Sequence, residues 1–186
     1  TIPTAGIADV AVDTTQIADD AISTAKIADD AVTIAKATGF GKIGQVITVT
    51  KTNTETSSST SYVDVGMDIT ITPSATTSKV LLMYYPRIGC NTASANVFLK
   101  IRNNTAGSDV TDDPFVVTRW PSDGQKSYYT QPQPMVVLDS PSTTSATQYK
   151  MQIKTNSGAW TLNMPADTGG YSDNEVSTVF AMEVLA

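Results

Sequence analysis

The ten residues VDVGMDITIT, at positions 63–72, alternate apolar side chains with polar residues or glycine. The odd-numbered positions hold Val, Val, Met, Ile and Ile, whereas the even-numbered positions hold Asp, Gly, Asp, Thr and Thr. Successive side chains of a β-strand point to opposite faces of a sheet, so a period of two predicts a strand. We therefore expect a strand that packs one face on a hydrophobic core and keeps the other face in water.

The same alternation recurs at 97–101, in YKMQIK at 149–154 and in WTLNM at 160–164. Two other stretches, VLLMYY at 80–85 and STVFAMEVLA at 177–186, are apolar at both odd and even positions. These two are expected to be strands covered on both faces. Segments rich in Ser, Thr, Asn, Gly and Pro separate about eight to ten expected strands, and no helix is expected. The pattern predicts an all-β fold, an antiparallel β-sandwich of jelly-roll type, over residues 45–186.

A different pattern fills the N-terminal part, where one ten-residue phrase occurs three times: IADVAVDTTQ, IADDAISTAK and IADDAVTIAK, at 7–36. Ten residues of α-helix fall about 80° short of three turns, so the apolar positions would drift around a continuous helix. A continuous strand would place them on opposite faces. A short turn followed by an extended segment fits better.

One such unit cannot bury its own Ile and Val side chains, so the repeat needs partners, and parallel copies of the same chain are the simplest supply. A disordered Ala/Thr-rich linker is the alternative, although a linker has no need for Ile in phase. We expect a self-associating shaft over residues 1–38. Its expected core positions are Ile2, Ile7, Val12, Ile17, Ile22, Ile27 and Val32.

A glycine-rich joint at 39–44 follows the repeat, and Gly39, Gly41 and Gly44 match the pattern G-x-G-x-x-G. That pattern binds dinucleotides when a strand precedes it and a helix follows it. Here a repeat precedes it and a strand pattern follows it. The glycines therefore predict a hinge or a tight packing point.

Composition argues against several classes of function. The chain has 12 Lys and Arg against 18 Asp and Glu, a net charge of −6, no His and a single Cys, Cys90. An acidic chain repels nucleic-acid phosphates, and no apolar run approaches the length needed for membrane insertion. Nucleophilic catalysis usually needs a His base, and zinc needs His or thiolate ligands. We therefore expect no enzyme activity, no cofactor and no metal, and we interpret Asp112 and Asp113 as a solvated turn rather than a calcium site.

Aromatic side chains cluster in one polar segment, RWPSDGQKSYY at 119–129. Arg and aromatic residues are typical of binding surfaces, and aromatic faces stack on sugar rings. The alternative is that these side chains pack inward or against a neighbouring subunit. The candidate receptor-contact residues are Arg119, Trp120, Tyr128, Tyr129 and, in a second Gly-rich segment, Tyr171.

Nearly the whole chain resembles a known family. The tandem IADDAISTAKIADDAVTIAK resembles the shaft repeats of bacteriophage tail fibres. The part that begins GKIGQVITVTK, continues through LDSPSTTSATQYKMQIK and ends VFAMEVLA resembles the β-sandwich head at the ends of such fibres, notably in marine and cyanobacterial phages.

The resemblance implies a homotrimer with an intertwined three-chain shaft and a trimeric head. It implies a place on the exterior of the virion, on the tail or the capsid, with an upstream part of the fibre or other virion proteins as partners. The head would contact a host surface glycan or protein. Two alternatives remain open: a capsid fibre, decoration or tail-assembly protein without a receptor, and, more remotely, a small polysaccharide depolymerase.

Overall fold

The computed structural model describes residues 43–92, 94–111, 116–119, 131–163 and 175–185, together with 22–23, 27–28 and 31 of the repeat. The chain divides into two units, Thr1–Gly41 and Lys42–Ala186. Every strand pair in the second unit is antiparallel. Within the described residues there is no helix, and so none that is long and apolar enough to cross a membrane. The predicted all-β, antiparallel fold is confirmed.

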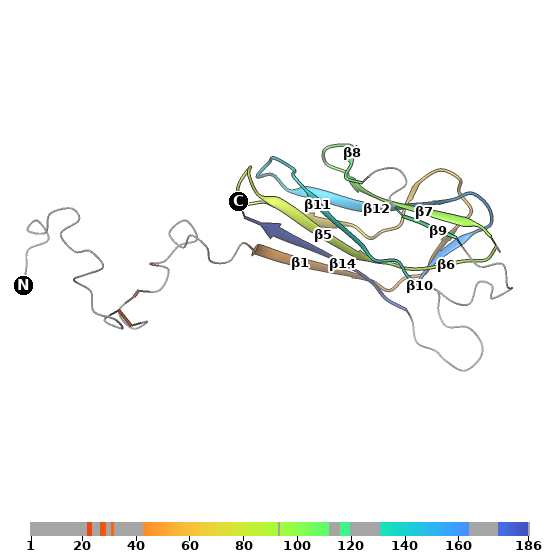
Figure 1. The fold of residues 1–186 in the computed structure, drawn as a ribbon, viewed down its shortest axis with the longest axis horizontal. Helices are drawn as coiled ribbons and strands as arrows, with labels where there is room; N and C mark the ends of the chain where they lie inside the picture. Colours follow the sequence, from red (N-terminus) through yellow and green to blue (C-terminus); the bar gives the residue numbers. More distant parts are fainter. Residues whose placement is uncertain are drawn as a thin grey trace, which may run out of the picture. The chain divides into compact units, whose positions relative to one another are not determined.

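Sheet I has four strands in the order β1-β14-β5-β11 (Figure 1). They are β1 (Ile43–Lys51), β14 (Ser177–Val184), β5 (Lys79–Tyr85) and β11 (Met135–Asp139). The register places Val49 opposite Val179, and Val179 opposite Tyr84. Because side chains opposite each other in a sheet share a face, this row and its neighbours turn one side of sheet I toward the core.

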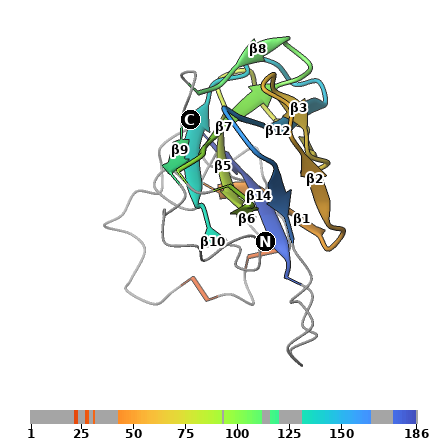
Figure 2. The same ribbon diagram turned by 90° about the vertical axis from the view of Figure 1, so that its right-hand side faces the viewer.

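Sheet II has six strands and forms the second layer (Figures 1 and 2). They are β3 (Val63–Asp64), β4 (Ile69–Ile71), β7 (Asn96–Asn103), β8 (Ser108–Asp109), β9 (Val116–Arg119) and β12 (Thr147–Thr155). The inward positions of the long strands are fully buried, and Leu99 lies opposite Ile153. The inner faces of sheets I and II supply one continuous core, which is the two-layered arrangement expected of a β-sandwich.

Sheet III extends sheet I at one end. Its strands are β10 (Gln131–Pro132), β6 (Arg87–Cys90), β13 (Trp160–Leu162) and β2 (Glu55–Ser57), in that order. One residue, Pro86, separates β5 from β6. Proline has no N–H to donate to a neighbouring strand, so the ladder of hydrogen bonds is interrupted there. The fourteen described strands exceed the predicted number because long strands are divided at such points.

The stretch 63–72 follows its predicted burial pattern but is not one continuous strand. Val65, Met67, Ile69 and Ile71 are at most 1% exposed. Gly66, however, has a φ of +61°, a left-handed conformation that interrupts extended backbone between β3 and β4. The alternation thus identified the core positions correctly, and the prediction of an unbroken strand was wrong.

The alternating stretches at 97–101 and 149–154 form β7 and β12 as predicted, and 160–162 forms β13; Met164 lies outside the described residues. The two doubly apolar stretches form β5 and β14. Only one face of each is buried by the described residues, none of which forms a second layer on the other face of sheet I. Cover on both faces therefore stays a prediction.

Little of the repeat is described. Ile22 and Ile27 are exposed, at 56% and 40%, and Ala31 N donates to Ala28 O at 3.0 Å in a turn. The other predicted core positions lie outside the described residues, namely Ile2, Ile7, Val12, Ile17 and Val32. Burial of the predicted core positions against further copies of the chain stays a prediction.

One glycine of the joint is described. Gly44 lies in β1, and a Cβ built there would meet Glu183 Oε2 at 2.8 Å. A side chain at this position would push into a buried carboxylate, so Gly44 makes a tight packing contact. Gly39 and Gly41 lie outside the described residues.

Candidate functional site

The candidate contact residues fall in two segments whose anchoring strands are described. Trp120, Tyr128 and Tyr129 lie in 120–130, and Tyr171 lies in 164–174, all outside the described residues. The backbone of Arg119 ends β9, opposite Asn96. The structure therefore gives the points at which the two segments leave and rejoin the sandwich.

Both segments are anchored beside β6. Ile88 pairs with Gln131, which follows the first segment, and with Leu162, which precedes the second. Two backbone hydrogen bonds reinforce this arrangement: Gln133 N donates to Pro86 O at 2.9 Å, and Asn163 N donates to Arg87 O at 3.0 Å. Two segments separated in sequence thus begin or end on opposite sides of one short strand.

A polar network fixes both ends of the second segment, and we call its members Lys51, Arg87, Asn163, Glu175 and Ser177 the loop anchor. Arg87 NH2 contacts Glu175 Oε1 at 2.5 Å, and Arg87 N donates to Ser177 Oγ at 2.9 Å. Ser177 Oγ donates to Asn163 Oδ1 at 2.6 Å, and Asn163 Nδ2 donates to Lys51 O at 2.7 Å. Asn163 and Ser177 are at most 1% exposed, so these bonds are shielded from water. Sequence analysis did not identify this network.

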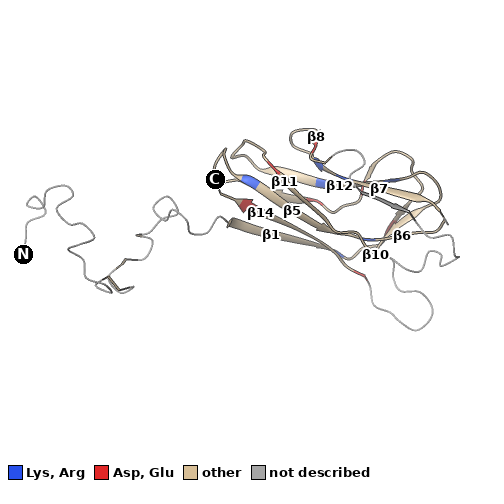
Figure 3. Cartoon of the chain, in the orientation of Figure 1, with Lys and Arg blue, Asp and Glu red and all other residues tan. Residues whose placement is uncertain are grey.

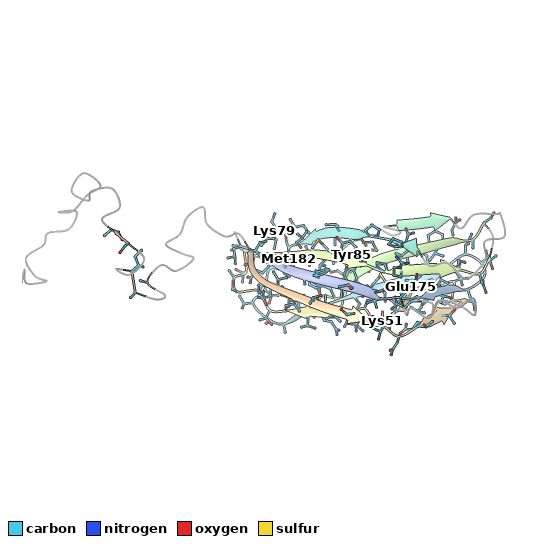
Figure 4. The ribbon with its side chains drawn as sticks, turned by 90° about the horizontal axis from the view of Figure 1, so that it is seen from below. Lys51, Lys79, Tyr85, Glu175 and Met182 are labelled. Carbon is cyan, nitrogen blue, oxygen red and sulfur yellow. The ribbon has the colours of Figure 1, made fainter. Side chains whose placement is uncertain are left out.

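The loop anchor lies at the other end of β1 from Ile43, and Figure 4 shows its Lys51 and Glu175 near each other and well away from Lys79. β1 runs from Ile43, next to the repeat-bearing unit, to Lys51 of the anchor. Nine strand residues span about 26 Å. β14 runs back from Ser177, so that Val184 lies opposite Ile43. Entry and loop anchor are therefore separated by the length of a strand.

A second feature is the outward side of sheet I, which we call the apolar face. Figure 4 shows it from below, with Met182 and Tyr85 labelled. Tyr85 and Phe180 pack edge to face with ring centroids 6.2 Å apart. Val136 and Leu138 are 52% and 49% exposed. The apolar face comprises Val46, Leu81, Met83, Tyr85, Val136, Leu138, Phe180, Met182 and Val184, with Thr48, Thr50 and Thr178 among them.

The outward side of sheet II has the opposite character and carries paired charges (Figure 3). Lys100 Nζ and Arg102 NH1 contact Asp109 at 2.9 and 3.0 Å. Lys150 Nζ contacts Asp64 at 3.0 Å, and the hydrogen bond from Gln152, followed by those from Lys150, lowers the pKa of Asp64 against the effect of burial. These ions satisfy one another, so this side presents a wet, nearly balanced surface.

Several other candidates resolve into structural roles. Cys90 is buried, and burial raises the pKa of its thiol. Asn103, which opens an N-x-T sequence, is 4% exposed, and its Nδ2 donates to Asp139. Asp112 and Asp113 lie outside the described residues. No group of three or more His, Cys, Asp or Glu that could hold a metal occurs in the part of the chain that the structure describes.

No family model and no curated protein matches this sequence. Solved structures with some similarity include an infectious bursal disease virus VP2 subviral particle, at 16% identity and a TM-score of 0.38. That match covers 76% of this chain and 37% of the other. The structure of the infectious bursal disease virus Gx strain is 15% identical, with a TM-score of 0.36, and the match covers 77% of this chain and 39% of the other. This chain thus spans less than two fifths of those chains, and similarity at this level establishes neither a shared fold nor a shared function.

Proposed function

We propose that this chain is part of a virion fibre, in which the β-sandwich is presented at the end of a repeat-built shaft and contacts the host surface. The observation that carries the proposal is the position of the loop anchor. Lys51 and Ile43 are the two ends of β1, so the segments with the candidate contact residues are anchored about 26 Å from the chain entry. Contact segments that are anchored a strand's length from the chain entry suit adhesion.

The proposed contact uses the segments 120–130 and 164–174. Trp120, Tyr128, Tyr129 and Tyr171 supply aromatic faces for sugar rings or protein side chains, and Arg119 supplies a cation beside them. Anchoring both segments beside β6 brings their ends together, so a single ligand can touch both. Each contact is expected to be weak, about 4 to 8 kcal/mol. Several copies on one fibre raise the overall avidity through effective concentration.

The experiment is a binding assay of the full chain on host cells and on immobilised host glycans. We expect Trp120→Ala and Tyr171→Ala to lose at least about tenfold in binding, which corresponds to about 1.4 kcal/mol. Tyr62→Ala is the matched control, because the ring of Tyr62 contacts Lys100 and Lys154 of sheet II and is no part of the loop anchor. The control should bind like the unsubstituted chain.

Two results would favour other functions. A chain that docks on purified virions but binds no cell or glycan would indicate a capsid fibre, decoration or tail-assembly protein. Release of reducing ends from host polysaccharide would indicate a depolymerase. Equal binding by the Trp120, Tyr171 and Tyr62 variants would place the contact elsewhere on the head.

A further inference from the structure

None of the described residues covers the apolar face, which has the composition of an interface core. Its side chains form rows across the four strands. One row holds Val46, Met182, Leu81 and Leu138, and the next holds Thr48, Phe180, Met83 and Val136. Aromatic residues and Met are enriched at interface cores, whereas Lys, Glu and Asp are depleted there.

Charge is nearly missing from this surface. On the four strands of sheet I, all of whose residues the structure describes, Lys79 is the one charged side chain on the outward side. It lies at the entry end, opposite Val184 (Figure 4). Lys51, Asp139 and Glu183 belong to the inward positions, where they bond to Glu55, Tyr149 and Ser74.

The size of the face exceeds what isolated surface residues explain. Four strands about 4.8 Å apart and about six residues long give a flat footprint of roughly 400 Å². Contiguous apolar patches of this size on soluble proteins mark interaction sites or aggregation liabilities. The face also lies on β5 and β14, whose sequences predict cover on both sides.

Charge favours a second copy of this chain as the occupant. The chain carries a net charge of −6, so two copies repel each other as they approach. On the apolar face, identical chains can meet without bringing like charges together, because each presents mostly neutral side chains to the other. A basic partner would gain nothing from a surface that offers it no acid.

The point of entry fixes the orientation of the copies. Ile43, where the repeat-bearing unit joins the head, begins β1, an edge strand of the same sheet. If the repeats of several copies run together, β1 must begin at the same end of each copy. The β1 strands of the copies then run parallel about a common axis. Val46 on edge strand β1 and Leu138 on edge strand β11 share one row. In a closed ring, the β1 edge of one copy therefore lies beside the β11 edge of the next.

We propose that the apolar face is the contact between copies of this chain, which stand parallel and side by side with their loop anchors at one end. The parallel order rests on the proposed function, because it takes the repeat as a shared shaft. The location of the contact rests on the geometry of sheet I alone.

The first test is disulfide trapping of the full chain carrying Val46→Cys and Leu138→Cys. Cys90 is the only native cysteine and is 1% exposed, so the introduced thiols are the reactive ones. Positions 46 and 138 are about 14 Å apart across the sheet, too far for an intrachain bond. Mild oxidation with a copper–phenanthroline complex removes two electrons and two protons from each pair of thiols. We expect covalent multimers that end at the native copy number and revert on reduction.

The matched control carries Thr70→Cys and Ser108→Cys, two exposed strand positions of sheet II, and should stay monomeric on a non-reducing gel. A second pair of variants probes affinity. Val136→Glu added to the Val46→Cys, Leu138→Cys chain should cut the yield of covalent multimer, even where the repeat alone keeps the copies together. Thr70→Glu in the same chain, which adds the same charge to sheet II, should leave the trapping unchanged.

The outcomes separate this inference from the proposed function. Trapping that Val136→Glu leaves unchanged, or equal trapping in the control, overturns the apolar face as the contact and leaves the fibre proposal standing. A single-chain mass for the unsubstituted protein at micromolar concentration overturns the inference, whatever the cell-binding result. A covalent product that never exceeds one copy, from a chain that light scattering shows to be a multimer, would also overturn it.

Discussion

At the scale of single residues, Glu183 shows how one buried charge joins distant parts of the head. It lies on β14, is 1% exposed, and accepts hydrogen bonds from Ser74 N and Ser74 Oγ at 2.6 Å and from Gln45 Nε2 at 3.0 Å. Burial alone raises the pKa of its carboxyl group, but the hydrogen bonds from Ser74 and Gln45 outweigh burial and lower the pKa to about 2. The carboxylate therefore ties β14 to β1 and to the loop that follows β4.

We predict that Glu183→Gln lowers the free energy of unfolding by about 1 to 3 kcal/mol at pH 7. The uncharged amide has only one oxygen and cannot accept all of the hydrogen bonds that the carboxylate accepts. The folded-state pKa is depressed, so the carboxylate stabilises the fold fully above its ordinary pKa of 4.5. This stabilisation is lost as the pH falls from 4.5 through about 2. The difference between variant and unsubstituted chain should shrink over that range in denaturant titrations.

Glu55→Gln is the control for Glu183, since Glu55 pairs with Lys51 near the surface and should change stability by less than about 1 kcal/mol. A Glu183→Gln deficit that stays constant down to about pH 2 would contradict the assigned role. From sequence, STVFAMEV was expected to be a strand covered on both faces, which gives no partner for Glu183. Its partner Ser74 lies 109 residues away, and no local pattern reveals a contact of that kind.

At the scale of elements, the loop anchor depends on a strand end with unusual backbone. Asn163 follows β13 with a φ of +50°, a conformation that Asn and Gly adopt more readily than other residues. Its side chain bonds Ser177 and the Lys51 carbonyl, so one residue connects β13, β14 and β1. Without the side chain of Asn163, backbone pairing between strands would leave the ends of β13, β14 and β1 without these hydrogen bonds.

We predict that Asn163→Ala lowers the free energy of unfolding by about 2 to 4 kcal/mol, because it loses two buried hydrogen bonds and strains the left-handed backbone. Asn163→Gly should lose less, since glycine adopts the positive φ and forfeits only the bonds. Urea titration of the three proteins measures both losses. Equal deficits for Ala and Gly would mean that the backbone conformation carries no cost.

The elements themselves were predictable to different degrees. Period-two patterns located β7, β12 and β13, because alternation depends only on neighbouring positions. The break at Gly66 was missed because a glycine can continue a strand or interrupt it, and the choice depends on packing. The loop anchor was missed because it depends on which strands pair with β6. No single segment of the sequence reveals that pairing.

At the scale of the whole molecule, the two outward sides of the sandwich predict different responses to salt. Paired ions cover sheet II, and neutral side chains cover sheet I. Sequence analysis found the doubly apolar strands but not what covers their outward side, and none of the described residues forms a second layer there. Receptor contact and copy number therefore stay predictions until measured.

We predict that the multimer persists when sodium chloride rises from about 50 mM to about 500 mM, because screening removes little from an apolar contact. Ammonium sulfate should strengthen association further, since excluded salts favour burial of apolar surface. Light scattering over a dilution series measures both trends. Dissociation at high sodium chloride would show that ion pairs, and not the apolar face, hold the copies together.

The run of β1 from chain entry to loop anchor also has a mechanical consequence. A chain tethered through its repeat and held at its loops carries tension along β1. The ladder between β1 and β14 has seven paired positions, and its hydrogen bonds lie across the direction of that pull. All of them then resist sliding together, whereas a pull from the side would open them one at a time. In the proposed fibre, the head would therefore resist drag along its length and peel most readily when force comes from the edge of the sheet.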